Sequence, residues 1–325
     1  MSGEGWRPHR RAFGAGAALA MLNASEALAR SVPTAPADWS SVWPPKEVIW
    51  LWPGDPPGWQ GGVTPVLPAE WPPNYLRSIA APTLNVFRPA RPNGQALLVC
   101  PGGAYVAVSA ANEGVDVAKA FNAVGVTVFV LAYRLPGEGW RDRADTPLQD
   151  VQRAMRIIRG RAETFRIRPD RIGVLGFSAG GHLAATLAVD HAQPVYASVD
   201  DLDRVDARPD FAGLIYPVIA MDGADAHPRS RDQLLGPAPS TDLVKSRSPM
   251  QRVTVSTPRC FIAHAVDDQT VPVDNSLRML AALRAAGVGC EGHLFEKGGH
   301  AFGLGRSGES NALWPQLFVR WLGST

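Results

Sequence analysis

Strand-like and helix-like segments alternate along most of this chain, and that alternation restricts the folds it can adopt. Apolar runs typical of buried strands occur at Thr83–Phe87, Ala96–Cys100, Val126–Ala132, Ile172–Gly176, Phe211–Tyr216, Arg259–His264 and Gly292–Phe295. Between them, apolar residues at three- and four-residue spacing predict helices over Val115–Val124, Leu148–Thr164, Ala179–Val189, Asn275–Ala286 and Asn311–Leu322. This order predicts an α/β fold, with a mostly parallel central sheet flanked by helices on both faces. We expect one such domain over residues 76–325, with functional groups beyond the carboxyl ends of its strands.

Two stretches depart from the alternation. Residues 30–75 are crowded with proline, tryptophan and glycine, so we expect them to wrap the surface with few regular elements apart from a short strand at Glu47–Trp52. The tryptophans in this segment either pack over an edge of the core or line a cleft. Residues 221–258 are polar and rich in Asp, Ser and Pro. They predict a long insertion over the strand ends, which would act as a cap or a pocket wall.

Residues 1–29 have the composition of a signal peptide. A basic head that includes Arg10 and Arg11 precedes the uncharged apolar segment Ala12–Leu22, and Ala27-Leu28-Ala29 supplies the small residues of a cleavage site. The apolar segment is shorter than the ~20 residues that span a bilayer, so we expect no permanent membrane anchor. The paired arginines resemble a twin-arginine export signal. We predict an exported protein, periplasmic or secreted; the alternative is a basic N-terminus without a targeting role.

Composition favours neither a charged partner nor a metal. The chain has 32 basic and 30 acidic residues and a net charge of +2, which gives no reason to expect nucleic acid or an anionic membrane as partner. The three cysteines, Cys100, Cys260 and Cys290, each lie beside a strand-like run and predict buried thiols rather than a disulfide framework. Because cysteines and histidines nowhere have zinc spacing, we expect no metal site. No pattern indicates the oligomeric state.

One segment predicts a reactive serine. An apolar strand ends in the run GFSAG at 176–180, and an apolar helix follows at once. This strand–turn–helix context is typical of the nucleophile elbow of α/β-hydrolases, in which side chains at 176 and 180 would collide with neighbouring backbone. The turn should expose the Ser178 hydroxyl and place the Ala179 N–H at a helix N-terminus, where it can donate to an oxyanion. His182 lies one helical turn further on and should be buried and hydrogen-bonded under the turn.

A second glycine-rich loop follows the predicted strand Ala96–Cys100. Gly102 and Gly103 allow backbone N–H groups to approach a substrate closely, so we expect them to complete an oxyanion hole with Ala179. The alternative is an ordinary turn at a strand end. Tyr105 follows these glycines and either lines the substrate pocket or covers it.

A serine hydroxyl becomes nucleophilic when a base takes its proton, and the base needs an orienting carboxylate. His300 lies in a glycine-flanked loop after the last predicted strand, where a base must project, whereas His264 and His293 belong to strands and fit packing or supporting roles. Asp267 and Asp268 both follow the predicted strand Arg259–His264, and spacing alone does not choose between them. The Asp-x-x-Val-Pro pattern common in α/β-hydrolases favours Asp268 as the acid, with Asp267 bracing the loop.

In their order along the chain, these segments resemble those of bacterial acetylxylan esterase-like α/β-hydrolases. The matching runs extend from about residue 48 to residue 304 and are LWPGDPPG, VCPGGAY, AYRLP, PLQDVQRAMRIIR, GFSAGGHLAA, SRDQLLG, FIAHAVDDQTVPVDNS and HLFEKGGHAFGL. The resemblance implies a cofactor-independent esterase that removes small acyl groups, typically acetyl, from sugar hydroxyls. It matches Ser178, Asp268 and His300 to a catalytic triad, and the Gly102–Gly103 loop to an oxyanion hole.

Two residues depart from the pattern of that family. Ala104 stands where a third glycine is expected, and Ala301 stands where the loop of the base usually has glycine. Both replacements are small, so they bear on the shape of the pocket more than on the chemistry.

The sequence thus predicts a serine esterase that acts on a small-molecule or oligosaccharide ester through an acyl-enzyme. A lipolytic esterase, a peptidase or an amidase would use the same triad. A non-catalytic carbohydrate-binding protein is an alternative of a different class, since tryptophans between residues 39 and 71 offer rings for sugar stacking.

Overall fold

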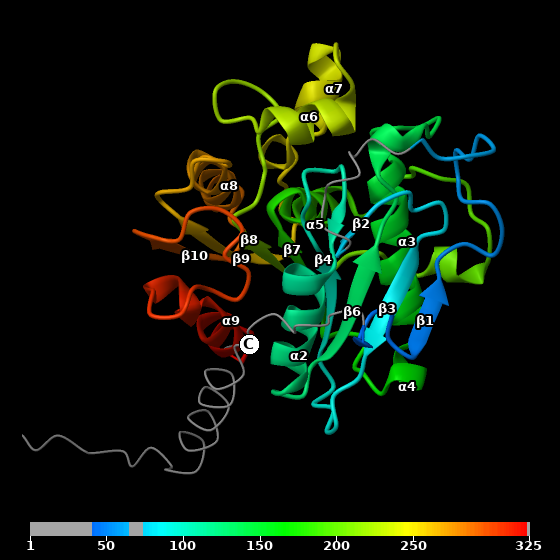
Figure 1. Ribbon diagram of the computed structural model, residues 1–325, viewed down its shortest axis with the longest axis horizontal. Coiled ribbons are helices and arrows are strands. Elements are labelled where there is room, and N and C mark those ends of the chain that lie inside the picture. The colour runs from blue at the N-terminus through cyan, green and yellow to red at the C-terminus, as the bar shows by residue number, and fades with distance from the viewer. Residues whose placement is uncertain (1–40, 65–73, 324–325) are drawn as a thin grey trace, which may run out of the picture.

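A computed structural model describes residues 41–64 and 74–323, and the predicted signal peptide lies outside these described residues. An eight-stranded sheet forms the centre of the molecule, with the strand order β1-β3-β6-β4-β7-β8-β9-β10 (Figure 1). Its strands are β1 (Glu47–Trp50), β3 (Thr83–Phe87), β4 (Ala96–Cys100), β6 (Thr127–Ala132), β7 (Ile172–Phe177), β8 (Phe211–Ile215), β9 (Arg259–Ala265) and β10 (Cys290–Phe295).

Most of the sheet is parallel. From β6 through β4, β7, β8 and β9 to β10, every neighbouring pair runs in the same direction. Strand β3 runs antiparallel to both of its neighbours, β1 and β6. Because parallel strands are joined by crossover helices, this pairing explains the alternation in the sequence. The predicted α/β fold with a mostly parallel sheet is confirmed.

Helices cover both faces of the sheet. On one face lie α3 (Thr146–Gly160), α5 (Ser178–Asp190) and α8 (Asp274–Ala285), and on the other lie α2 (Asp116–Asn122) and α9 (Trp314–Leu322). Within the described residues, none of the helices has the length and apolar character needed to cross a bilayer.

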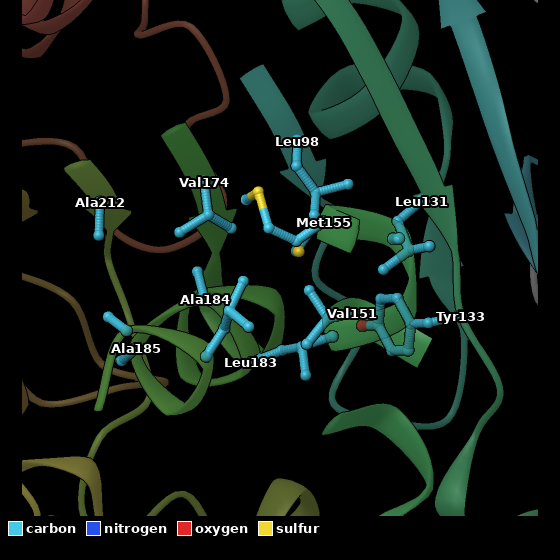
Figure 2. Packing of buried hydrophobic residues seen from close by; sticks show 14 of the residues in the cluster. Leu98, Leu131, Tyr133, Val151, Met155, Val174, Leu183, Ala184, Ala185 and Ala212 are labelled. Atoms are coloured by element: carbon cyan, nitrogen blue, oxygen red, sulfur yellow. The ribbon is translucent and has the colours of Figure 1, made fainter. Parts of the chain in front are cut away.

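The strands bury both of their faces. Along β4, Leu98 packs into the cluster under α3 and α5, while its neighbours Leu97 and Val99 pack into the cluster under α2 and α9. Figure 2 shows Met155 of α3 and Leu183 of α5 in the first cluster. Burial on both faces is the reason that these strands are continuous apolar runs rather than alternating ones.

The structure contains several short helices and strands that the sequence did not predict. The insertion at 221–258 contains α6 (Pro228–Leu235) and α7 (Thr241–Ser246), which lie beyond the strand ends in Figure 1. A two-stranded sheet pairs β2 (Tyr75–Leu76) with β5 (Val108–Ser109). The predicted helix Leu148–Thr164 is divided into α3 and α4 (Ala162–Phe165). These short helices and two-residue strands carry too few periods of an apolar pattern to be recognised.

A buried ion pair ties the proline- and tryptophan-rich segment to the core. Arg134, which follows β6, and Asp150, which lies in α3, are both fully buried. The distance between the guanidinium and the carboxylate is 2.8 Å. Trp52 donates its indole N–H to Asp150 over 2.9 Å, and Arg134 donates to the carbonyl of Pro57. Trp52 therefore packs on the core, as one of the two sequence interpretations proposed, whereas Trp50 is 64% exposed.

Replacing Asp150 with alanine should lower the free energy of unfolding by about 3–5 kcal/mol, because the substitution leaves the Arg134 guanidinium buried without its counter-charge. Urea denaturation followed by circular dichroism measures the change. The matched control is Asp170→Ala, which removes the carboxylate of the exposed pair with Arg168 and should alter stability little. Equal effects of the two substitutions would contradict the role given to the buried pair.

Candidate active site

Ser178 occupies a tight turn between β7 and α5. Its φ angle is +52°, which an L-residue adopts only under constraint. A Cβ on Gly180 would lie 2.1 Å from the carbonyl oxygen of Cys100, and one on Gly176 would lie 2.1 Å from the carbonyl oxygen of Gly180. The expectation that side chains at 176 and 180 would collide with backbone is confirmed. The turn is thus held directly against the end of β4.

Three predicted residues from distant parts of the chain meet at this turn. The loop after β10 carries His300, whose Nε2 lies 2.8 Å from the hydroxyl oxygen of Ser178. The loop after β9 carries Asp268, whose carboxylate lies 2.7 Å from Nδ1 of His300. Since β7, β8, β9 and β10 are parallel neighbours, their carboxyl ends open onto the same edge of the sheet.

The hydrogen-bond partners fix where the protons are. A carboxylate only accepts, so Nδ1 of His300 donates to Asp268, and Nε2 is left to accept the proton of the Ser178 hydroxyl. Burial by itself raises the pKa of Asp268, but hydrogen bonds from His264 and His300 outweigh it and hold this pKa well below its usual range. Asp268 is therefore a carboxylate at neutral pH.

The structure distinguishes the two neighbouring aspartates. One oxygen of Asp268 accepts the backbone N–H groups of Thr270 and Val271, while the other faces His300. Asp267 instead accepts the N–H of Gly299, and so braces the loop that carries His300.

His264 supports Asp268 from beneath. Its Nε2 lies 3.2 Å from the Asp268 carboxylate and 3.1 Å from the carbonyl oxygen of Val271, and its Nδ1 accepts from the Ser276 hydroxyl over 2.7 Å. The sequence prediction of a supporting role for His264 agrees with these contacts.

The glycine loop after β4 lies beside Ser178, but one of its N–H groups has another acceptor. The Gly102 N–H donates over 2.7 Å to the carboxylate of Glu113. The expectation that Gly102 presents its N–H to a substrate is therefore wrong. Within the described residues, no hydrogen bond uses the Gly103 N–H, and the Ala179 N–H belongs to the first turn of α5, which has no acceptor inside the helix. These two N–H groups are therefore available as hydrogen-bond donors to a ligand.

Tyr105 covers the site from below instead of lining it. Its side chain is 1% exposed, and its hydroxyl lies 2.8 Å from Nδ1 of His182. The Nε2 of His182 lies 2.8 Å from the carbonyl oxygen of Arg247, and burial lowers the pKa of this histidine to about 4. The suggestion that Tyr105 lines the pocket is wrong, because the left-handed backbone at Ala104 and Tyr105 turns the ring inward. His182 is buried and hydrogen-bonded under the turn, as predicted.

A cavity of about 220 Å³ opens above Ser178 and His300. Besides Ser178 and His300, nine residues form its wall: Tyr75, Gly103, Ala104, Ser109, Glu113, His227, Arg229, Thr270 and Ala301. Two of these, His227 and Arg229, come from the insertion at 221–258, which therefore serves as a pocket wall. Burial lowers the pKa of His227, and its Nδ1 is paired with the Ser230 hydroxyl at 2.8 Å.

Glu113 is a residue of this site that the sequence analysis missed. It lies in the helical turn η2 (Ala111–Val115), in a stretch with no motif, and the nearby Asp116 gives an equal local signal. Only the tertiary contact with Gly102 distinguishes the two acids.

Two alanines in the cavity wall hold backbone conformations that favour glycine. The φ angles are +54° at Ala104 and +56° at Ala301, in the left-handed region that costs a residue with a Cβ roughly 1–2 kcal/mol. These are the two positions at which the sequence departs from the glycines of the related family. The departure therefore strains the backbone and adds methyl groups to the cavity wall.

The sheet, its helices and the serine at the end of β7 define an α/β-hydrolase, and comparison with known proteins gives the family. The family model BD-FAE matches residues 84–283, well over half of the chain, so the protein belongs to the BD-FAE family. The resemblance to acetylxylan esterase-like hydrolases is likewise confirmed.

Two curated relatives match the chain over part of their own length. An acetylxylan esterase of Xylanibacter ruminicola is 35% identical over 224 residues, which are 67% of this chain and 43% of the relative. Endo-1,4-beta-xylanase B of Butyrivibrio fibrisolvens is 34% identical over 204 residues, 63% of this chain and 32% of the relative. The chain thus spans less than half the length of these relatives.

Solved structures match over most of both chains. The acetyl ester-xyloside bifunctional hydrolase from Caldicellulosiruptor lactoaceticus superposes with a TM-score of 0.71 at 34% identity, covering 86% of this chain and 96% of that chain. The carboxylesterase Cest-2923 from Lactobacillus plantarum gives a TM-score of 0.63 at 25% identity, covering 77% and 95%. Fold and family place the chain among the α/β-hydrolases.

Replacing Ala301 with glycine should raise the free energy of unfolding by up to about 1 kcal/mol, because relief of left-handed strain exceeds the extra entropy of glycine in the unfolded chain. Urea denaturation is the measurement. Ala281→Gly, in the middle of α8 and exposed, is the control and should destabilise by about 0.5–1 kcal/mol. The strain at position 301 is disproved if both substitutions destabilise alike.

Proposed function

We propose that this protein is a serine carboxylesterase that removes small acyl groups, above all acetyl, from carbohydrate esters such as acetylated xylan or its oligosaccharides. The observation that carries the proposal is the continuous hydrogen-bonded line from Ser178 through His300 to Asp268, at 2.8 and 2.7 Å, with Ser178 and His300 in the wall of a cavity. In this proposal Ser178 is the nucleophile, His300 the base and Asp268 the acid of a catalytic triad.

In the first step the Ser178 oxygen attacks the ester carbonyl carbon, and its proton passes to Nε2 of His300. The Asp268 carboxylate keeps the Nδ1 proton of His300 in place and stabilises the imidazolium that forms. The carbonyl oxygen becomes an oxyanion, for which the N–H groups of Gly103 and Ala179 are the donors we propose. The carbon–oxygen bond to the alcohol then breaks, His300 returns the proton to that alcohol, and the acyl group stays on Ser178.

In the second step water replaces the alcohol. His300 takes a proton from the water as its oxygen attacks the acyl carbon, and a second oxyanion forms at the same N–H groups. Collapse of this intermediate releases the carboxylic acid and returns the proton to the Ser178 oxygen. Each turnover consumes one ester and one water and restores the enzyme.

Cavity size and lining support a small acyl group on a polar alcohol. The volume of about 220 Å³ is below the ~300–1,000 Å³ typical of sites that enclose larger organic ligands. Ser109, Thr270, His227 and Arg229 place polar side chains in the cavity wall, beside which the hydroxyl groups of a sugar can lie. The acetylxylan esterase named among the relatives is consistent with this substrate class.

The proposal is tested by measuring acetate release from acetylated xylan, together with turnover of p-nitrophenyl esters of increasing acyl length and of a peptide amide. We expect turnover to be highest with acetyl esters and to fall as the acyl chain lengthens. Ser178→Ala should retain its fold and lose about 10⁶ in kcat. Preference for long acyl chains would indicate a lipolytic esterase, and cleavage of the amide a peptidase. If Ser178 of the wild type did not react with a fluorophosphonate, the result would favour the alternative of a non-catalytic carbohydrate-binding protein.

A pair of matched substitutions distinguishes the two aspartates in solution. Asp268→Asn should lower kcat by about 10⁴, since an amide cannot hold His300 in the required tautomer as a carboxylate does. Asp267→Asn keeps an oxygen acceptor for the Gly299 N–H and should retain activity within a few-fold. Steady-state kinetics on p-nitrophenyl acetate measures both. The reverse order of the two effects would move the acid to Asp267.

A further inference from the structure

A buried carboxyl group lies beside Ser178 and outside the proposed triad. Glu113 is 3% exposed, and its carboxylate forms part of the cavity wall. A Cβ on Gly102 would lie 2.9 Å both from a carboxylate oxygen of Glu113 and from the Cβ of Ser178. The missing side chain at position 102 is therefore what allows this carboxyl group to lie against the backbone next to the serine.

Glu113 connects the two loops that flank the serine. One of its oxygens accepts the Gly102 N–H over 2.7 Å, and the other accepts the hydroxyl of Tyr216 over 2.9 Å. The Tyr216 oxygen in turn accepts the Gly303 N–H over 3.0 Å. These three bonds form a buried bridge from the glycine loop after β4 to the loop that carries His300.

The bridge also reaches the ring of the base. The Tyr216 and His300 rings are 5.2 Å apart, centre to centre, with 65° between their planes, so that the tyrosine packs edge-on against the imidazole. Tyr216 holds a φ of +38°, a strained conformation for a residue with a large side chain. Its hydroxyl bond to Glu113 is one of the contacts that hold the ring in this orientation, together with packing on Phe177 and Phe302.

Few titratable groups interact with the carboxyl group of Glu113. Burial raises the pKa of Glu113, while hydrogen bonds from Tyr216 and Gly102 and the proximity of His300 lower it in part. The other titratable groups that interact with it are Tyr75 and Tyr133, and both carry a pKa raised above the usual range. Among the described residues, His300 is the basic side chain that interacts with Glu113.

We propose that Glu113 is a positioning residue for the esterase reaction: through Gly102 it fixes the loop that presents the Gly103 N–H, and through Tyr216 it fixes the His300 ring. The inference rests on the proposed function. It gives Glu113 no contact with the reacting atoms and no proton transfer. A carboxylate suits the role because both of its oxygens accept, and both neighbours, an N–H and an O–H, donate.

The experiment compares Glu113→Gln, Tyr216→Phe and the double variant with the wild type. In Glu113→Gln the amide oxygen can accept from only one of the two groups, so either the bond to the Gly102 N–H is lost or the Tyr216 hydroxyl must reorient to accept from the amide NH₂. In both cases the negative charge of the bridge is removed. We expect kcat on p-nitrophenyl acetate to fall about 10²-fold with KM changed less than three-fold, since a displacement of catalytic groups by about 1 Å has this effect. The double variant should fall by much less than the product of the single effects, because both substitutions break one bridge.

Two readouts separate positioning from a loss of folded protein. Titration with a fluorophosphonate counts the active sites, and kcat per site should still be reduced in Glu113→Gln. The acid limb of kcat/KM should move to lower pH, because the imidazolium of His300 loses a neighbouring negative charge. Asp116→Asn, which alters a second buried acid outside the cavity wall, is the matched control and should leave kcat and the pH profile unchanged.

The outcomes distinguish this inference from the proposed function. A wild type without esterase activity refutes the proposed function, and ¹⁵N-histidine NMR of the His300 ring then still tests the bridge, because Glu113→Gln and Tyr216→Phe should both shift its signals. An active wild type with Glu113→Gln of equal kcat and pH profile overturns the inference alone. So does a kcat per labelled site equal to that of the wild type, or full additivity in the double variant.

Discussion

The contact between the β7–α5 turn and the end of β4 is the constraint on which the rest of the site depends. At Gly180 a Cβ would lie 2.1 Å from the carbonyl oxygen of Cys100 and 2.4 Å from that of Pro101. Backbone packs on backbone here, with no room for a side chain on the turn. Because two buried parallel strands meet this closely, the serine of one strand end lies directly beside the glycine loop of the other. Both are held by a sheet that is covered on two faces.

The other functional groups reach the serine from the adjoining strand ends. Asp268 and His300 lie on loops after β9 and β10, and each loop is tied down by its own backbone contacts. A rigid sheet supplies the common edge, and short loops with fixed hydrogen bonds place each side chain. This division explains how groups separated by more than 100 residues reach hydrogen-bond distance, as Ser178 and His300 do.

Backbone strain is concentrated around the cavity. Seven non-glycine residues in the described part of the chain have positive φ angles. Five of these lie in the serine turn, the glycine loop, the strand end at β8 and the loop that carries His300: Ser178, Ala104, Tyr105, Tyr216 and Ala301. Strained conformations of this kind persist only where the surrounding structure over-determines them. The buried bridge through Glu113 and the packing of Tyr105 on His182 provide such support. The strained backbone lowers the stability of the folded protein, and it holds the side chains of the site in position before a substrate binds.

The sequence by itself determined the sheet, its long helices and the serine turn. These features are local: burial on both faces makes a strand a continuous apolar run, and the glycines at 176 and 180 are needed for a turn that lies within one short segment. It also located His300 in a loop after the last strand. It narrowed the carboxylate partner of His300 to two neighbours, Asp267 and Asp268, without an independent physical reason to choose between them.

Only the tertiary structure decided which partner each polar group has. Adjacent residues such as Asp267 and Asp268 point in different directions, and which one meets His300 depends on how the loops after β9 and β10 pack. The same holds for the Gly102 N–H, which meets Glu113 rather than the cavity, and for Tyr105, which turns inward. Hydrogen bonds need directions and distances between groups far apart in the chain, and a pattern of residue types along one segment contains neither.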